Sequence, residues 1–149
     1  MRRACTNYIK LEFPSRSANE ALARSAVAAL CAQLDPTLDE LGDIKTAVSE
    51  AVTNCIVHAY PDRLGEVTVR CAILEGDVLE IAVSDKGAGI PDIPKAMEPA
   101  FTTGGQERSG MGFTIMQSFM DRVRVRYRVG KGTTVVMHKA VASRTGAGR

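Results

Sequence analysis

The feature of this sequence that most restricts its fold is the order in which two periodicities follow one another. Residues 7–13 alternate apolar and polar side chains as a strand does, and 17–55 then carry apolar residues at helical spacing. Alternation returns over 67–83 and 123–138, each time around a glycine-containing turn, which predicts two hairpins. This order predicts an α+β sandwich in which helices cover one face of a mixed, mostly antiparallel sheet.

Capping residues predict where the two consecutive helices begin. Ser17 and Glu20 have the spacing of a capping box, and so do Thr37 and Glu40. A proline follows each helical segment and ends it. We expect each helix to turn one apolar stripe toward the core, formed by Leu22, Ala26, Ala29, Leu30 and Leu34 in the first and by Leu41, Ile44, Val48, Val52 and Cys55 in the second.

A long segment without periodicity separates the two hairpins. Residues 86–112 are rich in glycine and proline, and a loop of this length inside a domain is usually functional. A helix is predicted over 111–120, directly after it. We expect one domain over residues 1–141 and a disordered tail of small, polar and basic residues over 142–149.

Composition and charge exclude several classes of protein. The 149 residues suffice for one domain with its own core. Nineteen basic and seventeen acidic residues give a net charge of +2, which does not indicate a nucleic-acid or anionic-membrane partner. The longest apolar run, 26–32, is far shorter than the roughly 20 residues of a membrane span. We therefore expect a cytoplasmic protein that binds neither nucleic acid nor membrane.

Two further groups of residues are expected to have structural roles only. The cysteines form no C-x-x-C pair and have too few histidines beside them for a zinc site, which predicts reduced and mostly packed thiols. Four arginines alternate with apolar residues on the last hairpin and predict a solvated sheet face. The cysteines are Cys5, Cys31, Cys55 and Cys71, and the arginines are Arg122, Arg124, Arg126 and Arg128.

Two short motifs hold side chains suited to chemistry. Glu50 and Asn54 are four residues apart on the second predicted helix, so they project from the same side. An asparagine oxygen can ligate a hard cation and a glutamate can accept a proton, although an exposed helix face is the alternative. The run 85–89, Asp-Lys-Gly-Ala-Gly, follows a predicted strand, where Asp85 can accept from an exocyclic amine of a flat ligand; an ordinary turn is the alternative.

Two more motifs contain glycine. The cluster from Gly104 to Gly112 immediately precedes a predicted helix, and the amides of such a loop together with the positive helix end form a phosphate cradle. Its spacing matches neither the P-loop nor the dinucleotide-binding fingerprint, which disfavours both of those folds. The run 132–134, Gly-Thr-Thr, lies on the last hairpin and is also compatible with an ordinary turn.

In this order, the four motifs resemble the N box and the three glycine boxes of the GHKL superfamily, which includes gyrase B subunits, histidine protein kinases and mismatch-repair ATPases. The stretches 49–54, 101–103 and 107–116 are similar, more closely, to the anti-sigma F factors of sporulating bacteria, and the similarity runs from about residue 9 to residue 139. The resemblance implies a two-layer sandwich of the GHKL (Bergerat) type with a long ATP lid. It also implies a homodimeric serine kinase that uses ATP and Mg²⁺, inhibits a sporulation sigma factor and phosphorylates a serine on its anti-anti-sigma antagonist.

The resemblance also implies a role for individual residues. Glu50 would be the general base, Asn54 the Mg²⁺ ligand and Asp85 the acceptor for the adenine amino group, whereas Arg24 would contact protein partners. The sequence departs from the family at 104–106, where a lysine-proline pair is expected. The nucleotide contacts implied are Asn54, Asp85, Gly87, Gly89, Thr103, Gly104, Arg108, Ser109, Gly110, Met111, Gly112 and Thr133.

Two alternatives stay open on the sequence. One is a catalytic domain of the histidine-kinase type, which is disfavoured because the sequence opens with a strand and not with a phosphoacceptor helix pair. The other is a nucleotide-gated sigma-binding module without phosphotransfer. Glu50 speaks against that module, because a protein that only binds ATP needs Asn54 but no base.

Overall fold

The computed structural model describes residues 3–87, 112–128 and 131–141, and these form one five-stranded sheet. The strands lie in the order β1-β2-β3-β5-β4, and each of the four pairings is antiparallel. Both predicted hairpins are present, as β2–β3 and β4–β5, and β3 pairs with β5 to join them. The strands are β1 (Cys5–Pro14), β2 (Glu66–Leu74), β3 (Val78–Asp85), β4 (Arg122–Arg128) and β5 (Gly132–Ala140).

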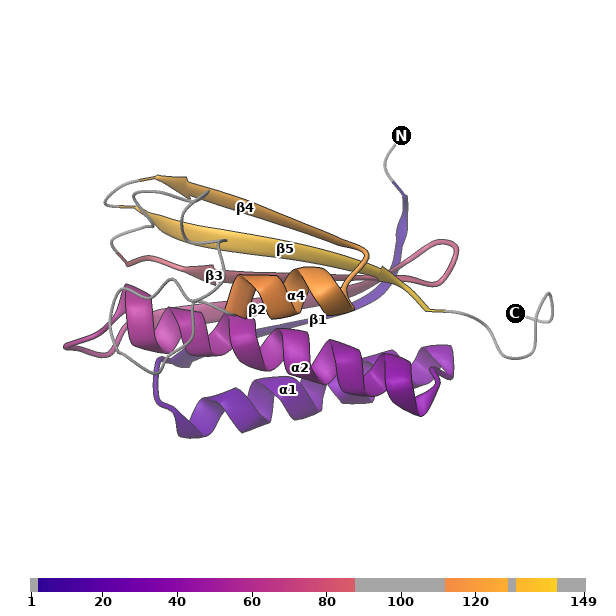
Figure 1. The fold of residues 1–149 in the computed structure, drawn as a ribbon, viewed down its shortest axis with the longest axis horizontal. Helices are drawn as coiled ribbons and strands as arrows, with labels where there is room; N and C mark the ends of the chain where they lie inside the picture. The colour runs from indigo at the N-terminus through magenta and orange to yellow at the C-terminus, as the bar shows by residue number, and fades with distance from the viewer. Residues whose placement is uncertain (1–2, 88–111, 129–130, 142–149) are drawn as a thin grey trace.

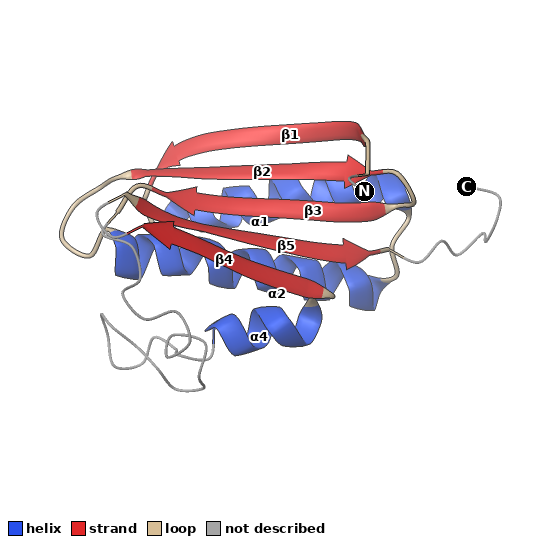
Figure 2. Ribbon diagram, turned by 90° about the horizontal axis from the view of Figure 1, so that it is seen from above, coloured by secondary structure: helices blue, strands red, loops and turns tan. Residues whose placement is uncertain are grey.

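In the described part of the chain, the helices α1, α2 and α4 cover one face of this sheet, with α2 between α1 and α4 (Figures 1 and 2). They are α1 (Ala18–Cys31), α2 (Leu38–Asn54) and α4 (Gly112–Phe119). A 3-10 turn, η1 (Ala32–Leu34), follows α1, and a π-helical turn, η2 (Cys55–Ala59), continues α2. The predicted α+β sandwich is thereby confirmed. None of the described helices is long and apolar enough to cross a bilayer.

The core lies between α2 and the inner face of the sheet. Ile44, Val48 and Val52 are fully buried, as their helical spacing predicts. Helix α4 adds Phe113 and Met116 from its own inner side. The sheet contributes the alternate residues that point toward the helices, namely Val67, Val69, Cys71, Leu79, Ile81, Val83, Val135 and Met137.

The stripe predicted for α1 is wrong by about one position. The structure buries Ala23 and Val27, whereas Leu22 is 57% exposed, Ala29 is exposed and Ala26 is only half-buried. Leu30 belongs to both stripes and is buried as predicted. Because α1 carries alanine or a larger apolar residue on most of its sides, periodicity alone does not define its inner face. Packing against α2 selects the face that contains the branched Val27.

Only one of the two predicted capping boxes is formed. Thr37 Oγ1 accepts from the Glu40 amide at 3.0 Å, and Glu40 Oε1 accepts from the Thr37 amide at 2.8 Å. Ser17 already has helical angles (φ −59°, ψ −31°) and makes no capping bond with its side chain. A capping side chain folds back from an extended residue, which Ser17 is not. Glu20 instead accepts a 2.5 Å hydrogen bond from the Ser49 hydroxyl on α2.

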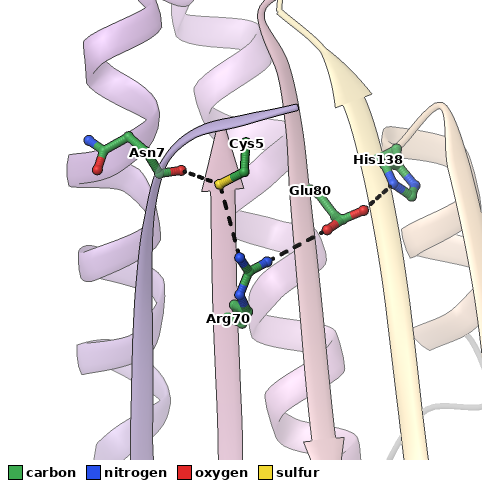
Figure 3. A network of polar contacts seen from close by, with 5 residues as sticks. All are labelled: Cys5, Asn7, Arg70, Glu80 and His138. Carbon is green, nitrogen blue, oxygen red and sulfur yellow. Dashed lines mark hydrogen bonds and ion pairs between the residues drawn. The ribbon is translucent and has the colours of Figure 1, made fainter. Parts of the chain in front are cut away.

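The face of the sheet opposite the helices carries a chain of polar contacts that crosses four strands (Figure 3). Arg70 Nη2 donates to Cys5 Sγ at 4.0 Å, and Arg70 Nη1 lies 3.8 Å from Glu80 Oε1. Glu80 Oε2 lies 2.8 Å from Nε2 of His138, its direct partner across the β3–β5 pairing. Cross-strand pairs of this kind contribute roughly 0.2–1 kcal/mol each, so this network reinforces the register of the sheet.

The arginines of β4 and the cysteines were expected to have structural roles only. Arg122, Arg124 and Arg126 are exposed on β4, which confirms the solvated face for these three. The cysteines are all free thiols, and all but the exposed Cys5 are buried. The tail 142–149 lies outside the described residues.

The two caps provide a matched test of the fold. We expect Thr37→Ala to lower the free energy of unfolding by about 1 kcal/mol, the usual cost of a lost N-cap. Ser17→Ala removes an exposed hydroxyl that makes no cap bond, so it should change stability by less than about 0.5 kcal/mol. Urea denaturation followed by circular dichroism measures both. Equal losses in the two variants would contradict the capping geometry described above.

Candidate functional site

The last turns of α2 and the start of α4 bring three predicted site residues together. Glu50 and Asn54 are half-buried on one side of α2, and Gly112 is the first residue of α4. A Cβ placed on Gly112 would lie 3.2 Å from Glu50 Oε1 and 3.3 Å from Asn54 Nδ2. A larger residue would therefore press on both polar side chains, and glycine keeps this space open.

A second group surrounds Asp85 at the end of β3. Its Oδ1 atom accepts hydrogen bonds from the Gly87 amide at 3.0 Å and the Thr133 amide at 3.2 Å. Burial raises the pKa of Asp85, while these two amides and the Cys55 thiol oppose that rise by stabilising the charged form. The structure thus places the Gly87 and Thr133 amides around the half-buried carboxylate of Asp85.

The π-helical turn η2 joins the two groups. Cys55 follows Asn54 directly and is buried, and this burial together with the charge of Asp85 raises the pKa of its thiol. At the other end of the turn, Gly87 packs so closely on Ala59 that a Cβ would lie 2.5 Å from the Ala59 carbonyl oxygen. Short π-helical segments within helices are frequent at functional sites. The turn therefore runs from Asn54 to the segment that follows Asp85, which it contacts through Ala59.

These side chains have the chemistry that a nucleotide and its cation require. Mg²⁺ is usually held by one or two protein oxygens together with phosphate oxygens, and the Asn54 amide offers such an oxygen. The first amides of α4 have no acceptor within the helix, which suits a phosphate. Among the described residues, no group of three or more His, Cys, Asp or Glu side chains could hold a metal by itself. The residues present fit a cation that is bound together with the phosphate groups of a nucleotide.

Several predicted nucleotide contacts fall outside the described residues, together with most of the long loop predicted over 86–112. They are Gly89, Thr103, Gly104, Arg108, Ser109, Gly110 and Met111.

The side chain of Arg24, the implied partner contact, is 38% exposed. Its Nη1 atom lies 3.4 Å from Glu20 Oε2 and donates to Ser49 Oγ at 3.4 Å. One edge of the guanidinium is therefore bound within the protein. Ser49 directly precedes Glu50 in α2. The contact of Arg24 with Ser49 therefore brings the surface of α1 next to the candidate site on α2.

Two residues of the site have no counterpart in the sequence prediction. Cys55 was assigned to the apolar stripe of the second helix, and Tyr60 was given no place in the site. The Lys86 amide donates to Tyr60 Oη at 2.6 Å, and Tyr60 Oη donates to the Glu66 carbonyl oxygen at 2.9 Å. Helical spacing does not reveal that α2 continues as a π-helical turn, which begins with Cys55 and is followed by Tyr60.

Comparison with solved structures supports the fold. The RsbU and RsbW domains of Rv1364c from Mycobacterium tuberculosis match with a TM-score of 0.67 and 17% sequence identity. The match covers 91% of this chain and 33% of that one.

Comparison of sequences shows the family. The family model of the histidine kinase-like ATPase domain matches residues 13–139. The anti-sigma F factor of Thermoanaerobacter pseudethanolicus is 55% identical over 139 residues, which cover 93% of this chain and 96% of that protein. The anti-sigma F factor of Caldanaerobacter subterraneus subsp. tengcongensis is 55% identical over 136 residues, 91% of this chain and 94% of its own. The chain therefore belongs to the anti-sigma F factor family and is built on a histidine kinase-like ATPase domain.

Proposed function

We propose that this protein is an ATP- and Mg²⁺-dependent serine kinase that also acts as an anti-sigma factor. In the ATP-bound state it binds and inhibits a sporulation sigma factor, and it phosphorylates a serine on an anti-anti-sigma antagonist. The 55% identity to an anti-sigma F factor, in an alignment that covers 93% of this chain, supports the binding and inhibition of a sigma factor. The approach of Glu50 and Asn54 to the start of α4 is the observation that carries the phosphotransfer part.

Each residue of the site has a distinct task in this proposal. ATP supplies the γ-phosphate, and Mg²⁺ offsets the charge on it. Asn54 contributes the protein oxygen that holds the cation. Glu50 accepts the proton of the substrate serine as its oxygen attacks. Asp85 orients the nucleotide by accepting a hydrogen bond from the adenine amino group.

The biological setting follows from the partners. A sigma factor and its antagonist act in the cytoplasm, and we place the protein there, as a homodimer. The high identity to anti-sigma F factors disfavours the alternative of a histidine-kinase-type catalytic domain. The alternative of a binding module without phosphotransfer is separated from the kinase by the test of Glu50 below.

Adenine recognition is tested with Asp85→Asn. The amide presents a donor where the adenine amine needs an acceptor, so the affinity for ATP should fall by about 1–3 kcal/mol, as for a broken buried polar pair. Calorimetric titration of ATP in the presence of Mg²⁺ measures the loss. Asp62→Asn, the same change at an exposed position, serves as the control. Unchanged ATP affinity in the Asp85 variant would refute the adenine assignment.

Phosphotransfer is tested with Glu50→Ala. This change removes the proposed base and leaves Asn54 in place, so ATP binding and sigma binding should persist while phosphorylation of the antagonist slows by roughly 10²–10⁴-fold. Transfer of labelled phosphate from ATP to the antagonist measures the rate. Glu12→Ala, at an exposed position on β1, should keep the normal rate. A normal rate in Glu50→Ala would show that Glu50 is not the base and is an ordinary residue on the helix face.

Partner docking is tested with Arg24→Glu. Part of the guanidinium faces solvent, where arginine can grip a carboxylate of a partner through two hydrogen bonds. Charge reversal should weaken binding of both the sigma factor and the antagonist, and the two should compete in the wild-type protein. Pull-downs with ATP for the sigma factor and with ADP for the antagonist measure this. Arg122→Glu, on the opposite face of the sheet, is the matched control, and full retention of both partners by the Arg24 variant would place docking elsewhere.

A further inference from the structure

The Ser49 hydroxyl makes two contacts to which the proposed function gives no task. It donates a 2.5 Å hydrogen bond to Glu20 Oε2, and it accepts a longer one, of 3.4 Å, from Arg24 Nη1. Arg24 Nη1 also lies 3.4 Å from Glu20 Oε2, so the three polar atoms form a closed triangle. All three side chains are half-buried where α1 lies against α2 (Figure 1).

This triangle uses only one nitrogen of the Arg24 guanidinium. Both contacts involve Nη1, and among the residues that the structure describes no hydrogen bond or ion pair involves Nε or Nη2. Arginine has five N–H donors in a planar fork, and Nε and Nη2 together can donate two parallel hydrogen bonds to one carboxylate. The guanidinium is thus held at one nitrogen and keeps a second edge with donors to offer.

Ser49 ties this guanidinium to a second helix. Glu20 lies four residues before Arg24 on α1, and an ion pair of this spacing on a partly exposed helix is weak because water screens it. Ser49 lies on α2, directly after the fully buried Val48. A hydroxyl on so firmly packed a helix gives the Glu20–Arg24 pair a fixed point, which the pair on α1 does not have by itself.

We propose that Ser49 is a positioning residue for partner docking, because its hydroxyl, together with Glu20, holds Nη1 of Arg24 and leaves the Nε–Nη2 edge to grip a carboxylate of a protein partner. The proposal rests on the proposed function, since it requires Arg24 to contact the partners. An arginine that is ordered before its partner arrives loses less side-chain entropy on binding, so the same contact gives a higher affinity. Because Ser49 directly precedes Glu50, the docking group is also tied to the turn of α2 that carries the proposed base.

The proposal predicts that lysine cannot replace arginine at position 24. A lysine has a single nitrogen, which Glu20 and Ser49 would occupy, and no second edge would remain for the partner. Arg24→Lys keeps the positive charge, yet it should weaken binding of the sigma factor by at least about 10-fold.

The first measurement needs no partner. NMR relaxation of the Arg24 Nε–Hε group reports how ordered the guanidinium is in the free protein. Ser49→Ala removes the hydroxyl and should lower the order parameter of this group, whereas Ser49→Thr keeps a hydroxyl and should restore it. Ser118→Ala, which removes an exposed hydroxyl from α4, should leave the order parameter unchanged. Alanine is the best helix former, so both alanine variants are expected to fold.

The second measurement is calorimetric titration with the purified sporulation sigma factor of the same organism, in the presence of ATP and Mg²⁺. Ser49→Ala should bind it about 3- to 10-fold more weakly, the effect of one modest hydrogen bond, while the affinity for ATP stays unchanged. Phosphorylation of the antagonist should show a raised KM with an unchanged kcat. In an Arg24→Ala background, Ser49→Ala should alter sigma binding by less than about 2-fold, because the hydroxyl acts through Arg24.

Three results would overturn the role of Ser49 by itself. One is an order parameter of Arg24 that does not fall in Ser49→Ala, or that does not recover in Ser49→Thr. Another is an equal loss of sigma binding from Ser49→Ala with and without the Arg24 side chain. The third is wild-type sigma binding by Ser49→Ala or by Arg24→Lys, although Arg24→Glu binds weakly. Full retention of both partners by Arg24→Glu would instead remove the docking assignment, and the role of Ser49 with it.

Discussion

The packing of α2 on the sheet, between α1 and α4, is the interaction on which the rest of the structure depends. Ile44, Val48 and Val52 are fully buried against the inner face of the sheet, and burial of each such side chain stabilises the fold by roughly 1.5–3 kcal/mol. The same helix carries Glu50 and Asn54 on another side, toward the start of α4. Glu50 and Asn54 thus project from a helix whose other side is fully buried, which limits how far they can move.

Sequence patterns predicted most of the fold because most of its elements have one polar and one apolar side. Alternation predicted all five strands, and helical spacing predicted the buried face of α2. The same reasoning placed Leu22 of α1 inside, where the structure exposes it. It also gave Ser17 a capping role that the backbone does not allow. Both errors concern choices that are made by contacts with α2, which local sequence does not contain.

The site was predictable to the extent that residue type and order reveal chemistry. The structure places Glu50 and Asn54 beside Gly112, and Asp85 beside Gly87 and Thr133, although their roles in binding and transfer stay predictions. Cys55 and Tyr60 were not predictable as parts of it. Their orientation depends on the change from α-helical to π-helical hydrogen bonding after Asn54, and nothing in the spacing of apolar residues marks that change.

The π-helical turn also has a consequence for how this chain tolerates changes in length. Such a turn accommodates one residue more than the regular helix would, so deleting a single residue within Cys55–Ala59 would restore regular winding. The end of α2 would then be one residue shorter, which would change the path of the chain from Asn54 to Tyr60. Insertions and deletions are usually harmless in loops and costly in cores. Here a helix end makes contacts of its own, those of Ala59 with Gly87 and of Tyr60 with Lys86, and a deletion would disturb both.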